Sequence, residues 1–189
     1  VGLARTVPEG YPPASDVGNL SILGYDPRRH YTGRGPLEAA NLGIVLDQDS
    51  VAFRCNLVTV ANGRLVDYSA GHITDAEAFQ LLAEVRAKFR ADDIQFARGV
   101  GYRHAMIWKN GPKSLKTTPP HDIQGVPAAG HWPEGEGAER LTDMIRQSWE
   151  ILAASSVNRI RLQKGERVAN SIWFWGQGTR PALPLFEKT

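Results

Sequence analysis

The run of residues 51–60, VAFRCNLVTV, constrains the fold more than any other stretch of the chain. It is rich in β-branched and aromatic residues, which favour a strand, and the Asn-Gly pair at 62–63 is typical of a hairpin turn. Side chains alternate between the two faces of a strand, so one face is apolar, with Phe53, Cys55 and Leu57. The other face carries Arg54 and Asn56, which are either solvated or in contact with a ligand.

The rest of the chain alternates between helix-like and strand-like segments. A capping box at residues 74–77 opens a helix that continues to about residue 90, and a second amphipathic helix is expected from about 138 to 153. The shorter strand-like runs are residues 44–46, 64–68, 94–97, 102–108 and 169–178. This pattern predicts an α/β (α+β) domain, with a mixed β-sheet and two main helices packed on it. Residues 110–133, rich in proline and glycine, are predicted to form a long functional loop without regular structure.

Composition and charge narrow the class of protein. The net charge is only +2, and no block of lysine and arginine is present, which gives little support to a nucleic-acid or membrane-surface partner. No apolar run approaches the roughly 20 residues that span a bilayer. Cys55 is the single cysteine, which excludes an internal disulfide and fits a reducing cytoplasm. We therefore expect a globular domain in the cytoplasm.

Ser15 stands where a short helix is expected to begin. Two prolines at 12–13 precede it, an apolar-spaced run follows, and Gly24 and Pro27 stop that run. A serine at this position either caps the helix, worth about 1 kcal/mol, or acts as a nucleophile beside the free amides and the positive end of the helix dipole. The local pattern leaves both interpretations open, and the two are compatible.

Several blocks of the sequence together resemble one enzyme family. Residues 14–27, ASDVGNLSILGYDP, are similar to the signature of the archaeal-type, cofactor-independent (2,3-bisphosphoglycerate-independent) phosphoglycerate mutases of the alkaline phosphatase superfamily. The blocks FRCN (53–56), GYRH (101–104), PPHD (119–122) and IWFWGQG (172–178) resemble further motifs of that family, in the same order and spacing.

The resemblance implies a role for particular residues. Ser15 would accept the phosphoryl group and contact one of two divalent metal ions, Mn or Mg. The candidate substrate-binding residues are Arg34, Arg54, Asn56, Arg103, His104, His121 and Asp122. Residues 1–24 would form a nucleophile-bearing segment, and residues 25–189 a lid-like substrate-binding domain inserted in a larger core. That core, which would supply the remaining metal ligands, is expected outside this chain.

The implied reaction interconverts 3-phosphoglycerate and 2-phosphoglycerate, a step of glycolysis and gluconeogenesis, through a phosphoserine intermediate. The histidines are scattered without metal-ligand spacing, so we expect the isolated chain to be inactive and to bind no metal ion tightly. Two alternatives stay open: a homoserine kinase-like phosphotransferase of the same family, and a binding module without catalysis. The lack of a Walker-type phosphate loop weighs modestly against the kinase.

Overall fold

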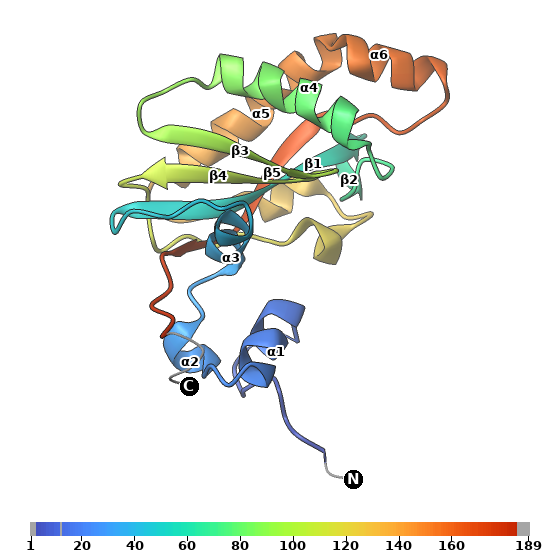
Figure 1. Ribbon diagram of the computed structural model, residues 1–189. Helices are drawn as coiled ribbons and strands as arrows, with labels where there is room; N and C mark the ends of the chain where they lie inside the picture. Colours follow the sequence, from blue (N-terminus) through green and yellow to red (C-terminus); the bar gives the residue numbers. More distant parts are fainter. Residues whose placement is uncertain (1–2, 12, 185–189) are drawn as a thin grey trace.

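A computed structural model describes residues 3–11 and 13–184, and its centre is a five-stranded sheet (Figure 1). Residues 1–2, 12 and 185–189, which belong to the two expected segments 1–24 and 25–189, lie outside the described residues, and Pro12 is one of them. The strands are β1 (Ser50–Ala61), β2 (Arg64–Asp67), β3 (Ile94–Val100), β4 (Arg103–Lys109) and β5 (Ser171–Thr179). Four of them lie in the order β5-β1-β4-β3, and β2 pairs with the end of β1.

The α+β class is confirmed, whereas the strand directions correct the expectation of a mixed sheet. Each of the four described pairings, β1 with β2, β4 and β5, and β3 with β4, is antiparallel. Two of these pairs are joined by short turns, and strands joined by a tight hairpin must run antiparallel. The expected strand at 44–46 does not form. Ile44 and Leu46 instead lie in an irregular segment that pairs with no strand, and they pack against Ala52 and Ile107 at the sheet's surface.

Helices cover both faces of the sheet (Figure 1). The two main helices, α4 (Asp75–Lys88) and α5 (Ala138–Ala154), lie on one face together with α6 (Ser156–Gln163), and α3 (Arg34–Asn41) lies on the other. The predicted capping box is present, because the Thr74 side chain accepts from the Glu77 amide and the Glu77 carboxylate accepts from the Thr74 amide. The short helices α1 (Ser15–Ile22) and α2 (Pro27–His30) lie below α3 in this view.

Strand β1 is buried on both faces, and its alternation follows the prediction. Phe53, Cys55 and Leu57 belong to the main core beneath α4 and α5, and all three are fully buried. Arg54 and Asn56 point the other way and are nearly as buried, at 6% and 2% exposed. A buried guanidinium and a buried amide on one strand face require polar partners there.

The loop at 110–133 has more structure than the sequence indicates. It contains two single-turn 3-10 helices, η1 (Pro120–Ile123) and η2 (Ala128–His131). The indole of Trp173 on β5 donates to the Thr118 carbonyl at 2.9 Å, and Trp132 stacks on Trp173 with ring centroids 5.6 Å apart. These contacts hold the loop against β5, beside the polar face of β1.

The first helices are attached to the sheet by specific contacts. Tyr31 donates its hydroxyl to the Asp16 carboxylate of α1 at 2.7 Å. A Cβ at Gly35 would overlap the backbone of Ala52, so glycine is what allows α3 to lie directly on β1. Across the described residues, no helix combines the length and apolar character that a bilayer crossing requires.

Candidate functional site

A cleft of about 850 Å³ lies where the starts of α1 and α3 meet the polar face of β1, the end of β5 and the loop at 115–122. Six of the eight sequence-predicted site residues line it: Ser15, Arg34, Arg54, Asn56, His121 and Asp122. They come from positions more than 100 residues apart, so the fold, and not the local sequence, brings them together. Arg103 and His104 are not among the residues that line the cleft.

Ser15 is the first residue of α1, and its side chain is exposed. The helix is preceded by Ala14 in an extended conformation, and no side chain caps it. The local N-cap interpretation of Ser15 is therefore wrong, because the serine lies one position inside the helix, where its hydroxyl does not face the free amides in the capping geometry. The first intrahelical bond runs from the Gly18 amide to the Ala14 carbonyl, at 3.0 Å. The hydroxyl of Ser15 is thus left facing the cleft at the positive end of a helix.

Alternating charges connect α1 with the floor of the cleft. Asp16 lies 3.9 Å from Arg34, measured from Oδ2 to Nη1. The Glu38 carboxylate oxygen Oε2 lies 3.7 Å from Arg34 Nε and 3.2 Å from Arg54 Nη1. Asp16 also accepts the Tyr31 hydroxyl, and burial together with this carboxylate raises the pKa of Tyr31.

Arg54 is the most buried cation of the cleft. Burial lowers the pKa of its guanidinium, and the nearby Glu38 carboxylate opposes that shift. The guanidinium carbon lies 5.2 Å from the ring centroid of Trp175, a cation-π contact. Its Nε is buried without a hydrogen-bond partner in the described part of the chain. A buried guanidinium with an unsatisfied donor is suited to an anionic ligand.

Asn56 and Trp175 form a fixed pair beside Arg54. The Trp175 indole donates to Asn56 Oδ1 at 3.1 Å, and Asn56 Nδ2 donates to the Tyr68 carbonyl at 3.3 Å. Both ends of the Asn56 amide are therefore engaged in hydrogen bonds that hold the wall of the cleft. Of the two tryptophans, Trp173 is the core residue, at 1% exposed, which confirms the expectation that one of them packs in the core.

His121 and Asp122 lie at the rim. The His121 ring packs edge-on against Trp175 and Tyr68, at 5.2 and 6.1 Å between centroids, and its Nε2 is 3.6 Å from Asp122 Oδ1. The loop that carries them is tied to β5 by Thr117, which donates to the Gln177 side chain at 2.6 Å and accepts from the Gly176 amide at 3.1 Å.

Arg103 and His104 have different surroundings. The Arg103 guanidinium lies over the ring of Tyr102, 5.4 Å from its centroid, and Tyr102 does line the cleft. His104 is fully buried on the core side of β4, where its Nδ1 accepts from the Gly99 amide at 3.1 Å. Burial lowers the pKa of His104 to about 4. His104 and the other even-numbered residues of β4 face the main core. The expected contact between His104 and substrate is therefore not possible in this arrangement.

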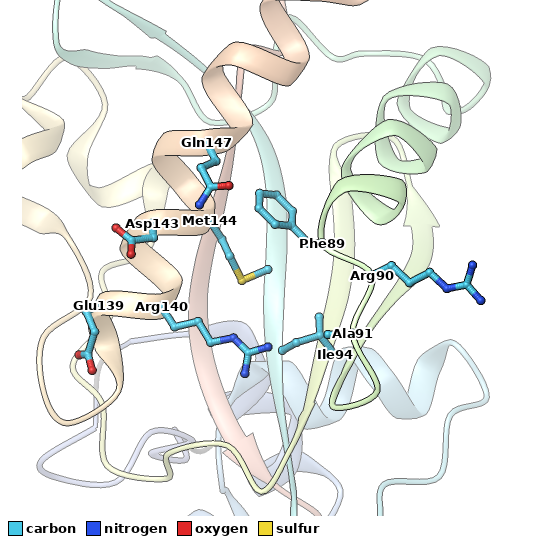
Figure 2. Close-up of a pocket in the computed structure, with 9 residues that line it drawn as sticks. All are labelled: Phe89, Arg90, Ala91, Ile94, Glu139, Arg140, Asp143, Met144 and Gln147. Carbon is cyan, nitrogen blue, oxygen red and sulfur yellow. The ribbon is translucent and has the colours of Figure 1, made fainter.

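A second pocket, of about 380 Å³, lies between the end of α4 and the start of α5 (Figure 2). One of its two arginines, Arg140, is already paired with Asp93, with Nη2 2.9 Å from Oδ1, and lies over the Trp108 ring. None of the sequence-predicted site residues lines this pocket. The large cleft is therefore the candidate site.

Within residues 3–11 and 13–184, no group of three or more His, Cys, Asp or Glu side chains is placed to hold a metal ion. Asp16, the carboxylate nearest to Ser15 in sequence, is engaged by Tyr31 and Arg34. The described residues around Ser15 thus do not form a ligand set for the two ions that the resemblance implies.

Among the residues that sequence reasoning missed are Thr117 and Tyr68, which line the cleft, and Glu38, which pairs with Arg54 behind it. Glu38 had a usable signal, because it stands four residues after Arg34 on a predicted helix, a spacing that pairs opposite charges. Thr117 and Tyr68 gave no such signal, since their positions depend on contacts with distant strands.

Comparison with known proteins identifies the family. The family model described as 2,3-bisphosphoglycerate-independent phosphoglycerate mutase matches residues 1–158. A Geobacter sulfurreducens protein described as a probable 2,3-bisphosphoglycerate-independent phosphoglycerate mutase is 52% identical over the whole chain, which covers 48% of that relative. The Methanosarcina acetivorans enzyme of the same name is 46% identical over 99% of the chain and 47% of its own length.

A solved structure agrees with this. The cofactor-independent phosphoglycerate mutase from Thermoplasma acidophilum matches with a TM-score of 0.69 and 27% identity, over 94% of this chain and 49% of its own. The chain spans about half the length of the curated relatives it matches. On this evidence the chain belongs to the 2,3-bisphosphoglycerate-independent phosphoglycerate mutase family.

Proposed function

We propose that this chain is part of a mutase that interconverts 3-phosphoglycerate and 2-phosphoglycerate through a phosphoserine at Ser15. One observation carries the proposal: the hydroxyl of Ser15, which makes no capping bond among the described residues, and the buried guanidinium of Arg54, incompletely paired within them, line the same cleft. A nucleophile beside a cation that has a free donor suits phosphoryl transfer from a small, doubly anionic substrate.

In the proposed reaction, the phosphoryl group is transferred to Ser15 and back. The Oγ atom attacks phosphorus, the bond between phosphorus and the 3-oxygen of glycerate breaks, that oxygen takes up a proton, and the serine hydroxyl gives one up. Glycerate then turns within the cleft, and its 2-hydroxyl attacks the same phosphorus with loss of its proton. The bond to Oγ breaks and Ser15 regains its proton, so the cycle is balanced.

The cleft residues supply binding and orientation. Arg34 and Arg54 are assigned to the carboxylate and phosphate, which planar guanidinium groups bind in bidentate fashion. Asn56 keeps Trp175 in place under Arg54, and His121 with Asp122 closes the rim. Arg103 is assigned to substrate through movement of its side chain past Tyr102. We assign His104 to support of its strand, because its ring is fully buried.

The two divalent ions that the resemblance implies, Mn or Mg, would neutralise charge on the phosphoryl group when bound. Ser15 is the ligand that we assign to this chain, and the others are assigned to the core of the parent protein. We place the boundary between the nucleophile-bearing segment and the substrate-binding domain at residues 24 and 25, and the protein in the cytoplasm.

The test uses phosphorus NMR to follow the reaction of the full-length parent protein with Mn²⁺ and 3-phosphoglycerate, without added bisphosphoglycerate. We expect 2-phosphoglycerate to appear, Ser15→Ala to abolish it, and Ser21→Ala, on the same helix, to leave it unchanged. A second tube holds ATP and homoserine, and growth of phosphohomoserine there alone would assign the kinase instead. If neither product appears in its tube, the result would favour a binding module. Residues 1–189 alone should show no turnover.

A further inference from the structure

Among the described residues, Glu38 is the one carboxylate that lies within salt-bridge distance of both arginines that line the cleft. Its Oε2 atom lies 3.2 Å from Arg54 and 3.7 Å from Arg34, and its side chain is 14% exposed. Arg34 and Arg54 come from different elements, the start of α3 and the middle of β1. A single carboxylate oxygen therefore lies between two cations that belong to different elements.

Both arginines have an N–H donor that is available to a ligand. The Nε atoms of Arg34 and Arg54 are buried and have no hydrogen-bond partner among the described residues. A buried N–H without a partner is unfavourable, and a ligand that accepts its hydrogen bond removes that cost. Arg54 is itself 6% exposed and lines the cleft, and its other neighbour is the face of Trp175, which accepts no conventional hydrogen bond.

The backbone beneath Glu38 is held firmly. Gly35 presses α3 against the Ala52 backbone, next to Arg54, and a Cβ there would overlap it. The carboxylate therefore reaches Arg54 from a fixed base on the neighbouring helix. Glu38 restricts the rotation of the long arginine side chains. Side chains that are oriented before the ligand arrives lose less entropy on binding.

We propose that Glu38 is a positioning residue, which aims Arg34 and Arg54 at one anionic group of the substrate by holding both guanidinium groups on a single carboxylate oxygen. The proposal rests on the proposed function for the identity of the substrate, and on the geometry alone for the class of ligand, an oxyanion such as a carboxylate or a phosphate. Glu38 does not touch the reacting atoms.

Substitutions of Glu38 distinguish a role in positioning the arginines from a purely electrostatic role. If Glu38 only reduced the positive potential of the cleft, Glu38→Gln would tighten the binding of an anion, and Glu38→Asp would change nothing. If Glu38 positions the arginines, both variants weaken binding, because glutamine loses the charge that holds two cations and aspartate draws the carboxylate back by about 1.5 Å. Glu139→Gln, on the start of α5 in Figure 2, makes the same change in net charge away from the cleft and is the matched control.

The experiment uses the full-length protein and two probes, inorganic phosphate and 3-phosphoglycerate, with dissociation constants from calorimetry and kcat and KM from turnover. We expect Glu38→Gln to weaken binding of both probes at least about tenfold, the size of one lost charge-assisted contact, and to raise KM more than it lowers kcat. The Arg54 Nε–H signal in a ¹⁵N NMR spectrum, assigned with Arg54→Lys, should shift on phosphate addition in the wild type only. Circular dichroism checks that the variants fold.

The outcomes for Glu38 and for the proposed function are distinct. Turnover by the wild type with equal or tighter binding in Glu38→Gln would overturn the positioning role and leave the mutase assignment standing. Phosphate binding that depends on Glu38, without turnover of 3-phosphoglycerate, would overturn the mutase assignment and support the positioning role. An unchanged Arg54 signal in the wild type would overturn the positioning role as well.

Discussion

The buried His104 makes the stability of the fold depend on pH in the acidic range. Its Nδ1 accepts from the Gly99 amide, so the ring proton of the neutral form lies on Nε2. A second proton would have to go onto Nδ1, where it would face the Gly99 N–H instead of an acceptor. Full burial is the main reason that the pKa of His104 falls to about 4 from its ordinary value of 6.5, and the Gly99 amide acts in the same direction.

The sign and size of the effect follow from linkage. Below pH 6.5 the unfolded chain binds a proton at His104 that the native state refuses, so stability is complete above that pH and falls as the pH is lowered toward 4. Between pH 6.5 and pH 5, at about 1.4 kcal/mol for each pH unit, His104 should remove about 2 kcal/mol from the free energy of unfolding.

The assay is urea unfolding at pH 7, 6 and 5, followed by tryptophan fluorescence, in the wild type and in His104→Asn. Asparagine offers an oxygen near the position of Nδ1 but does not titrate, so the variant should be less stable at pH 7 because of the void it leaves, yet lose about 2 kcal/mol less than the wild type on acidification. The control is His72→Asn, since His72 is exposed and its φ of 52° suits asparagine. Parallel losses in wild type and His104→Asn would refute the reasoning.

Three further changes should be visible in the same urea measurements at pH 7. Gly35→Ala should cost about 1 to 3 kcal/mol, because its Cβ would overlap the Ala52 backbone, and an unchanged midpoint would show that α3 moves freely on the sheet. Arg161→Met should cost about 3 to 5 kcal/mol, because the 3%-exposed guanidinium bonds the Glu77 carboxylate at 2.8 Å and two backbone carbonyls, so a loss below 1 kcal/mol would contradict that network. Thr74→Ala should cost about 1 kcal/mol by removing the cap of α4, and Thr142→Ala, at a half-buried position inside α5 where the hydroxyl only donates to the Ala138 carbonyl, should cost less.

The features that could be predicted from the sequence are those that depend on neighbouring residues. The period of two in β1 placed Arg54 and Asn56 opposite the core because alternation is a local property of a strand. The capping box at Thr74 was equally local. The six residues of the cleft came from the family resemblance, since nothing in the pattern around His121 connects it with Ser15.

The features that failed depend on tertiary contacts. Local pattern left Ser15 as either an N-cap or a nucleophile, and the N-cap interpretation is wrong because the helix starts one residue earlier than it requires, with Ala14 before it. His104 stands beside Arg103 in the sequence, yet alternation along β4 sends its side chain into the core. The apolar run at 44–46 lacked a partner strand, and pairing cannot be deduced from one strand alone.

The pairing of β1 with β5 has a consequence for the order in which the protein can be made. Arg54 lies opposite Trp175 across this ladder, 121 residues later in the chain. At about 5 to 20 residues per second of synthesis, the ribosome needs roughly 6 to 24 seconds between the two. Throughout that interval β1 has one edge without its partner, and Ser15, made earliest, has no cleft to face. The site is therefore the last part of this chain that can form, and a nascent chain stopped before β5 should expose an open, apolar sheet edge to chaperones.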